Sequence, residues 1–428
     1  MRGLMITFLY LLMFGCGFQI PSVMALAYMW TDLVRPQYVA YSLITTLPLS
    51  MICATLAIPA WFFCKDKPRR ITFGTTMLII WAIWMTISTF TAVVQDAAWD
   101  KWNFAFKAAV FAVLLPYFFN TRAQIEAAIL TVLLSVGMNV ISIGSKTIIN
   151  GGGYGVDLGV TGGGYGLTEG SMFAMASASL IPLFFWGGKY SVLLPGGWIR
   201  KLLVWGMVAL SISASLGTFA RTGLVSMGVL AVAGFFAAKR KIVYVIVVFM
   251  IGSSMAGFMG DAWTDRMTTI KSAEGDSSAM GRVAAWLWTL DYVKEHPLGG
   301  GFDIYRTNTV HVQMADGSTL VEHGKAFHSI YFEVLGELGF PGLAMFLSML
   351  GWFLFSMLRV RRIMRKRPEC AWVSDAATAL FIATLVFMAG GAFVGVAFQP
   401  YYWYLFGIGI AVLHYADREL AGELPVDR

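Results

Sequence analysis

Charged residues are scarce in this sequence, at 13% of its 428 positions against roughly 25% in an ordinary soluble domain. Hydrophobic residues make up 58%, and the mean hydropathy is +0.69. A soluble fold cannot bury that much apolar surface, so an ordinary globular domain is excluded. The uncharged runs 71–94 and 202–220 are long enough to cross about 30 Å of hydrocarbon, which takes about 20 helical residues. The chain is therefore predicted to be an integral membrane protein.

Cysteine is also scarce, and none of the four cysteines lies in the long polar stretch of the sequence. They fall inside or beside apolar runs, at Cys16, Cys53, Cys64 and Cys370. This distribution indicates neither a disulfide framework nor a Cys-x-x-Cys metal site. The N-terminus has no small-residue cleavage pattern after its apolar start, so we interpret it as the first membrane segment.

The apolar segments predict an all-α, polytopic bundle of about twelve transmembrane helices. Beyond the N-terminal region they lie at 40–63, 71–94, 104–119, 124–143, 170–187, 202–220, 222–238, 242–258, 338–358, 374–396 and 400–415. Residues 3–33 are interrupted by Pro21, and we interpret them as one crossing plus a broken or interfacial piece. The bundle divides into transmembrane helices in 1–258, a large outward loop in 259–337 that contains short helices, and helices with a tail in 338–428.

Lysine and arginine gather in short clusters on one side of the predicted spans, which the positive-inside rule assigns to the cytoplasm. The clusters are 65–70, Lys189 with Arg200 and Lys201, 239–241, and 359–367. The loop 259–337 then faces outward, with six basic against eleven acidic residues, and parity predicts that both termini are cytoplasmic. The net charge of +7 therefore reports topology and gives no reason to expect a nucleic-acid partner.

A second outward segment, 144–169, contains the sequence Gly-Gly-Gly-Tyr-Gly twice, at 151–155 and 162–166. The segment lacks the Gly-Lys-Ser/Thr of a phosphate-binding loop. A flexible flap and a lid over a substrate are both compatible with it.

The loop 259–337 carries four of the five histidines, so chemistry is expected there. One helix is predicted from an N-cap at Ser277 or Ser278 to the His296-Pro297 pair, followed by a glycine run. A second helix is predicted from near Ala326 to Leu338, with His328 in its first turn. Glycines and a proline at 339–342 separate it from the next span.

Three short motifs in the region 221–342 resemble the bacterial O-antigen ligase and O-antigen polymerase superfamily. His328-Ser329, nine residues, Gly339, two residues and Gly342 look like that family's histidine signature. Arg282, Trp286 and the His-Pro-Leu-Gly-Gly-Gly run at 296–301 match an upstream motif. The 220–223 sequence, Ala-Arg-Thr-Gly, resembles the family's arginine at the outer end of a middle helix.

The resemblance implies an inverting glycosyltransferase of the bacterial inner (plasma) membrane that works at the periplasmic face. It would move a glycan from an undecaprenyl diphosphate carrier to an acceptor hydroxyl, on lipid A core or another glycolipid or glycan, without a metal or other cofactor. The same superfamily includes ligases and repeat-unit polymerases of surface polysaccharide and lipopolysaccharide. Both activities stay open, and the match to the histidine signature favours the ligase.

The proposed chemistry needs groups that bind the developing pyrophosphate charge and a base for the acceptor. Arginine offers always-charged donors that suit phosphate oxygens, so Arg221 and Arg282 are the candidates for that role. Histidine can act as a base near neutral pH, and His328 is the candidate. Alternatively, Arg221 could snorkel to the membrane interface, Arg282 could be a solvated helix charge, and His328 a half-buried loop residue.

Other polar residues of the loop could contact sugar or phosphate, or could be ordinary surface. They are Tyr305, Arg306, Lys325 and Tyr331. Glu322, His323 and His328, with His311 not far off, lie close in sequence, but their spacing fits no His-Glu-x-x-His pattern, so a metal site is not predicted.

Two other classes of function compete with the enzyme. A transporter or lipid flippase could have about twelve spans, but carriers usually show paired halves and ionisable residues at mid-membrane depth, and these spans contain almost no Asp or Glu. A scaffold whose outer loop binds a partner is the third possibility, and it should tolerate loss of His328.

Overall fold

The protein is mostly helical. The computed structural model describes residues 2–36, 47–63, 70–152, 167, 169–268, 277–313 and 319–423. The first helices are α1 (Arg2–Gln19), α2 (Pro21–Val34), α3 (Leu49–Phe63), α4 (Phe73–Phe90), α5 (Gln95–Leu114), α6 (Arg122–Asn150) and α7 (Gly170–Tyr190). The later helices are α8 (Gly197–Gly217), α9 (Arg221–Ala237), α10 (Lys241–Thr268), α11 (Ser277–Glu295), α12 (Ile330–Met364), α13 (Ala371–Gly391) and α14 (Pro400–Leu420). This pattern confirms a mainly helical fold.

Six helical segments of the described residues are long and apolar enough to cross a membrane. They are Phe73–Phe90, Arg122–Asn150, Gly170–Tyr190, Gly197–Gly217, Ile330–Met364 and Pro368–Gly391. Shorter apolar helices occupy Gly3–Gln19, Leu49–Phe62, Arg221–Ala237 and Lys241–Ser254. Helices also cover the predicted spans 104–119 and 400–415, as α5 and α14, although neither is among the six. The count of about twelve spans therefore stays a prediction.

Residues 2–34 form two helices that pack on each other, α1 and α2, joined at Ile20. The hydroxyls of Tyr10 and Thr31 share a hydrogen bond of 2.6 Å between them. The expectation of cytoplasmic termini rested on one crossing in this region, and it stays a prediction. Part of the predicted span 40–63 and most of the glycine-tyrosine repeat lie outside the described residues.

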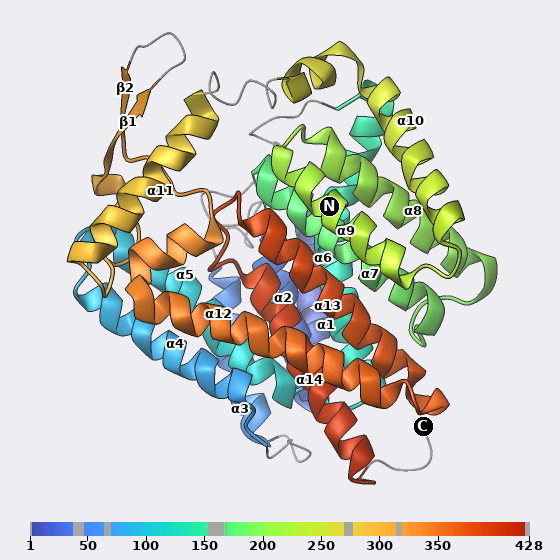
Figure 1. Cartoon of the computed structure of the whole chain (residues 1–428). Helices are drawn as coiled ribbons and strands as arrows, with labels where there is room; N and C mark the ends of the chain where they lie inside the picture. The colour runs from blue at the N-terminus through green and yellow to red at the C-terminus, as the bar shows by residue number, and fades with distance from the viewer. Residues whose placement is uncertain are drawn as a thin grey trace.

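Helix α11 and the strands β1 and β2 lie at one end of the bundle, and the C-terminus lies at the other (Figure 1). There α11 packs against α12 and against a two-stranded antiparallel sheet of β1 (Thr309–Gln313) and β2 (Thr319–His323). The sequence predicted helices in this loop but no hairpin. Its alternation of threonine, valine and histidine is typical of strands.

Helix α11 confirms the predicted loop helix, since it spans Ser277–Glu295. The second loop helix begins at Ile330, with Ser329 at its N-cap, and not near Ala326 as predicted. It continues through a break at Gly339, where φ is 67° and ψ is −168°. The predicted glycine break is therefore present, but the two helices share one long element.

The glycine run after α11 packs backbone to backbone against this break in α12. Gly300 N and Gly301 N donate to the carbonyl oxygens of Gly336 and Glu337 at 3.0 and 2.9 Å, and Phe340 N donates to Pro297 O at 3.0 Å. A Cβ atom at Gly339 would lie 2.3 Å from Pro297 O. The two glycine motifs of the sequence are thus one structural unit, which places the end of α11 beside the start of α12.

Replacement of Gly339 by alanine tests this unit. The backbone region at Gly339 is essentially restricted to glycine, so strain alone should cost about 1–3 kcal/mol of unfolding free energy, and the clash adds to it. Gly351→Ala is the matched control, because it lies in the same helix with nothing within 4 Å of its Cβ. Thermal unfolding in detergent should show a lower midpoint for Gly339→Ala only, and equal midpoints would contradict this packing.

Candidate functional site

A cavity of about 350 Å³ opens between residues 303–328 and the ends of the bundle helices. Its walls come from α5, the residue before α7, the segment 303–306, the residues before α12, the first turns of α12, and the connection between α13 and α14. The lining residues are Lys101, Phe104, Glu169, Met172, Asp303, Tyr305, Arg306, Ala326, Phe327, His328, Glu333, Glu337, Gly395, Val396, Phe398 and Gln399.

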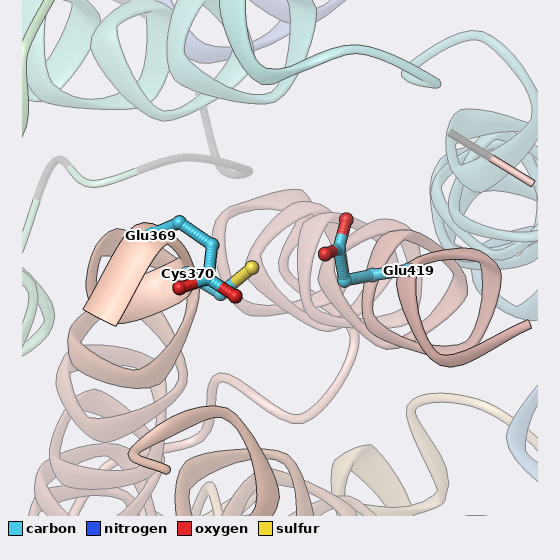
Figure 2. Close-up of side chains that lie close together, drawn as sticks. All are labelled: Glu369, Cys370 and Glu419. Atoms are coloured by element: carbon cyan, nitrogen blue, oxygen red, sulfur yellow. The ribbon is translucent and has the colours of Figure 1, made fainter. Parts of the chain in front are cut away.

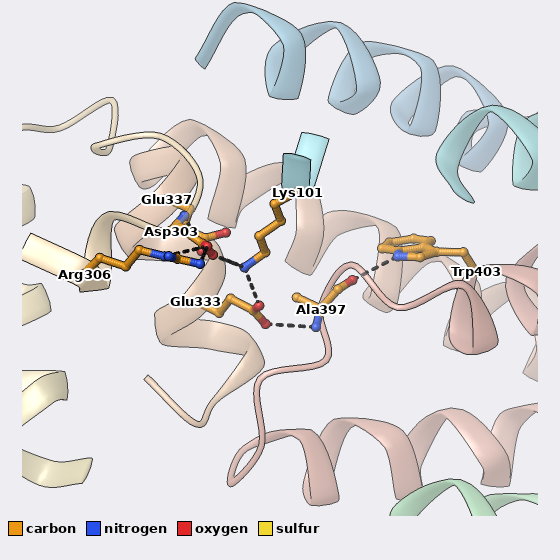
Figure 3. Close-up of polar contacts among 7 residues, drawn as sticks. All are labelled: Lys101, Asp303, Arg306, Glu333, Glu337, Ala397 and Trp403. Atoms are coloured by element: carbon orange, nitrogen blue, oxygen red, sulfur yellow. Dashed lines mark hydrogen bonds and ion pairs between the residues drawn. The ribbon is translucent and has the colours of Figure 1, made fainter. Parts of the chain in front are cut away.

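A buried lysine forms the centre of one wall (Figure 3). Lys101 Nζ lies 2.7 Å from Glu337 Oε1, 2.9 Å from Glu333 Oε1 and 3.6 Å from Asp303 Oδ1. Asp303 also pairs with Arg306, whose Nη2 is 2.8 Å from Asp303 Oδ2. Buried charges of this kind persist only when they are paired. Here Lys101 joins α5 to the segment 303–306 and to α12.

Backbone N–H groups also donate hydrogen bonds to these carboxylates. Asp303 N donates to Glu337 Oε1 at 3.0 Å, and Ala397 N donates to Glu333 Oε2 at 3.0 Å. The rings of Phe302 and Phe398 lie 5.7 and 5.1 Å from Lys101 Nζ. Water exclusion by these rings strengthens the ion pairs, since Coulomb attraction grows as the local dielectric constant falls.

His328 lies in the connection before α12 and lines the cavity, so the prediction that it begins a helix is wrong. Its φ is 46°, a left-handed conformation that is uncommon outside glycine, although histidine adopts it more often than most residues. Phe327, the residue before His328, is held in place by two interactions. Its carbonyl oxygen accepts a 2.7 Å hydrogen bond from Trp286 Nε1, and its ring is buried. Strain at such a position is typical of functional sites.

His328 is neutral at physiological pH. Burial, followed by the positive charges of Arg282 and Lys325, lowers its pKa from 6.5 to about 4. A neutral imidazole has a free lone pair, which is the state that can accept a proton from a hydroxyl group. Arg282 and Lys325 are close enough to His328 to lower its pKa. All three were predicted site residues, and the structure brings them together.

Arg282 lies on α11, one turn before Trp286, and both project toward α12 and the α13–α14 connection. Arg282 Nη1 donates to Phe393 O at 3.3 Å, and the Trp286 ring stacks on Phe332 at 5.0 Å. Burial raises the pKa of Glu169, and the charge of Arg282 opposes that rise. Arg282 therefore lies near both Glu169 and His328, beside the cavity but not among its lining residues in the described part of the chain.

Arg221 is the first residue of α9, as its predicted place at a helix end requires. Helix α9 packs against α7 and α13, and a Cβ on Gly390 of α13 would lie 2.6 Å from Ser226 Oγ of α9. Arg221 thus lies near the C-terminal end of α13. The connection that follows α13 forms part of the cavity wall. It does not line the cavity within the described residues.

Of the remaining predicted residues, two line the cavity and two make contacts with other parts of the protein. Arg306 and Tyr305 line the cavity. Lys325 Nζ pairs with Glu322 Oε2 at 2.6 Å, which partly offsets its charge. Tyr331 donates its hydroxyl to Met388 O at 3.0 Å, so it bridges α12 and α13. Their roles toward a substrate stay predictions.

Sequence reasoning did not single out Lys101, Glu169 or the pair Glu333 and Glu337. One signal was available, because Lys101 stands next to a predicted span on the outward side, where lysine is disfavoured. The i, i+4 spacing of Glu333 and Glu337 on a helix was a second signal.

One group of side chains that could hold a metal ion occurs among the described residues (Figure 2), and none of its members lines the cavity. The donor atoms of Glu369, Cys370 and Glu419 come within 4.8 Å of one another, where α13 begins and α14 ends. Glu419 Oε1 also lies 3.5 Å from Arg367 Nη1. This group therefore cannot take part in chemistry at His328.

Replacement of Lys101 by methionine tests the ion cluster. It would leave Glu333 and Glu337 buried without their cation, while Asp303 keeps its pair with Arg306, and this should cost about 3–5 kcal/mol of unfolding free energy. Lys189→Met is the control, because its ion pair with Asp375 is largely exposed and should contribute about 1 kcal/mol or less. Yield and thermal midpoint in detergent should fall for Lys101→Met alone, and equal behaviour of the two variants would contradict the assignment.

Comparison with known protein families divides the chain into two matched regions. Residues 1–192 match a family of unknown function (DUF5935), and residues 206–347 match the O-antigen ligase family. No curated protein matches the chain. The cavity draws Lys101 and Glu169 from the first region and His328, Glu333 and Glu337 from the second. Residues 206–347 thus carry a domain of the O-antigen ligase family, which supports the relationship to the O-antigen ligase and O-antigen polymerase superfamily that the motifs predicted.

Proposed function

We propose that the protein is a metal-independent, inverting glycosyltransferase that moves a glycan from undecaprenyl diphosphate to an acceptor hydroxyl at the periplasmic face of the inner membrane. The observation that carries the proposal is the neutral His328 at the cavity wall, held beside the cationic Arg282 and Lys325 inside an O-antigen ligase domain. Such an arrangement joins a base for the acceptor to a positive field for the leaving group.

The reaction needs one proton transfer and one substitution. His328 accepts the proton of the acceptor hydroxyl as its oxygen attacks the anomeric carbon. The bond from that carbon to the diphosphate oxygen breaks, and the diphosphate leaves with the electron pair. Attack from the opposite side inverts the anomeric centre. The protonated histidine then returns its proton to solvent.

The arginines supply the charge that the leaving group requires. Arg282 is close enough to influence His328, and Arg221 lies at the head of α9 on the same end of the bundle. The fixed donors of arginine suit a diphosphate whose charge grows in the transition state. The polyprenyl tail would lie in the lipid against the apolar helices.

Between the two activities of the superfamily, we favour the ligase, which attaches finished glycan to lipid A core or another acceptor. A repeat-unit polymerase uses the same donor chemistry and remains the alternative. The organisation into helices 1–258, an outer loop 259–337 and helices 338–428, in about twelve spans with cytoplasmic termini, belongs to this proposal.

The test compares lipid-linked glycan in cells that carry wild-type, Arg221→Ala, Arg282→Ala or His328→Ala protein at matched expression. Loss of a general base should reduce transfer roughly 10²–10⁴-fold, and loss of a charge clamp by about 10²-fold or more. His323→Ala is the matched control, because this exposed histidine lies in β2 of the same outer region.

The species that accumulates decides between the two activities. Long polymer on undecaprenyl diphosphate identifies a ligase, and single repeat units identify a polymerase. Unchanged surface polysaccharide and unchanged lipid-linked glycan in all three variants would contradict the proposal. That result would favour the transporter and scaffold hypotheses.

A further inference from the structure

The cavity and its surroundings carry opposite charge. Four carboxylate side chains line the cavity, from Glu169, Asp303, Glu333 and Glu337, against the two cations Lys101 and Arg306. Both cations are already paired with those carboxylates. Arg282 and Lys325 act on His328 but do not line the cavity in the described part of the chain. His328 therefore lies between this acidic interior and a rim formed by Arg282 and Lys325, of which Lys325 is paired with Glu322 at 2.6 Å. The two cations of the rim outnumber that one carboxylate, so the rim is the less acidic side.

This excess of carboxylates over cations disfavours a diphosphate in the interior. Its negative groups would approach carboxylates in a partly dry site, where repulsion is much stronger than in water. At the rim the same groups would meet Arg282 and Lys325. The leaving group of the proposed reaction therefore belongs on the rim side of His328, which leaves the interior to the other reactant.

The interior has the chemistry of a sugar subsite. Its volume of about 350 Å³ is near the lower end of the range of roughly 300–1,000 Å³ for ligand pockets, which suits a small part of a glycan. Carboxylate oxygens accept hydrogen bonds from hydroxyl groups, and aromatic rings such as Phe104 and Phe398 offer apolar faces. Among the described residues, Glu337 Oε2 is buried without a hydrogen-bond partner, so it is a polar atom that an entering hydroxyl could satisfy.

We propose that this acidic cavity binds the terminal sugar of the acceptor, that it selects an uncharged or amino sugar, and that it rejects sugars with a carboxylate or phosphate. The inference rests on the proposed transfer function and adds the class of acceptor to it. The sugar's reacting hydroxyl faces His328 while the donor diphosphate stays at the rim.

Two residues control the cavity without belonging to the proposed catalytic machinery. A Cβ on Gly395 would lie 3.4 Å from Glu333 Oε2, an ordinary contact, so a larger side chain there enters the cavity beside that carboxylate. Glu169 lines the cavity outside the Lys101 cluster, and its replacement by glutamine removes negative charge at nearly constant size. The first variant tests occupancy, and the second tests charge selection.

The experiment measures binding of matched methyl glycosides to the full-length protein in nanodiscs by saturation-transfer NMR. The probes are a neutral hexoside, a hexosaminide, a hexuronide and a hexoside phosphate. Inorganic pyrophosphate, read by thermal stabilisation, reports the basic rim separately. Asp375→Asn is the control for Glu169→Gln, because it removes a carboxylate that pairs with Lys189 at the other end of the bundle.

We expect signal from the neutral and amino glycosides and none from the two acidic ones. Gly395→Leu should weaken neutral glycoside binding at least about tenfold and leave pyrophosphate stabilisation unchanged, which also shows that the variant is folded. Glu169→Gln should raise hexuronide binding relative to hexoside by roughly three- to tenfold, since it removes one repulsive charge, and Asp375→Asn should not.

Three results would overturn the inference. They are hexuronide binding equal to hexoside binding, no hexoside binding at all, and hexoside binding that Gly395→Leu leaves unchanged. Absence of pyrophosphate stabilisation in the wild type counts against the proposed transfer function instead. The two failures are therefore distinguishable in one set of samples.

Discussion

The end of the bundle that holds the cavity depends on one buried cation. Lys101 has lost most of its hydration, and its charge is tolerable only because three carboxylates surround it. Those carboxylates belong to different segments, so the ion cluster fixes the segment 303–306 and the first turns of α12 against α5. The hydrogen bond from Ala397 N to Glu333 adds the α13–α14 connection. A cavity can persist at this junction because its wall is held by charge and not by side chains that fill it.

The cluster also orders the electrostatics of the site. Lys101 gathers three carboxylates on the cavity wall, whereas α11 supplies Arg282 and the residues before α12 supply Lys325, which is paired with Glu322. His328 lies at the boundary, where burial and those cations keep it neutral. The proposed transfer must separate an anionic leaving group from a hydroxyl nucleophile, and this polarity would separate them across one imidazole. The O-antigen ligase domain supplies the histidine and the arginines, whereas the N-terminal region supplies the lysine.

Much of the helical framework could be predicted from the sequence, because uncharged runs of membrane length leave few alternatives to a helix. Helix α11 was predictable as well, since serines precede it and His296-Pro297 ends it. The conformation of His328 was not, because periodicity continued the helical pattern of α12 backward through it. The hydrogen bond from Trp286 Nε1 to Phe327 O holds the connection before α12 in place, and no pattern in the neighbouring sequence predicts it. Lys101 could not be paired with Glu333 and Glu337, since its partners lie more than 200 residues away.

The central claim is that a neutral His328 takes the acceptor proton while an anionic donor occupies the basic rim next to it. The most direct test is the pH dependence of glycan transfer by the purified protein, at limiting and at saturating lipid-linked donor. The profile at limiting donor reports the free enzyme and should fall only as the pH approaches about 4, where His328 becomes protonated. At saturating donor the diphosphate offsets the charges of Arg282 and Lys325, so the pKa of His328 should rise and the fall should move to higher pH. Equal profiles with a fall near 6.5, or no transfer at any pH, would contradict the account.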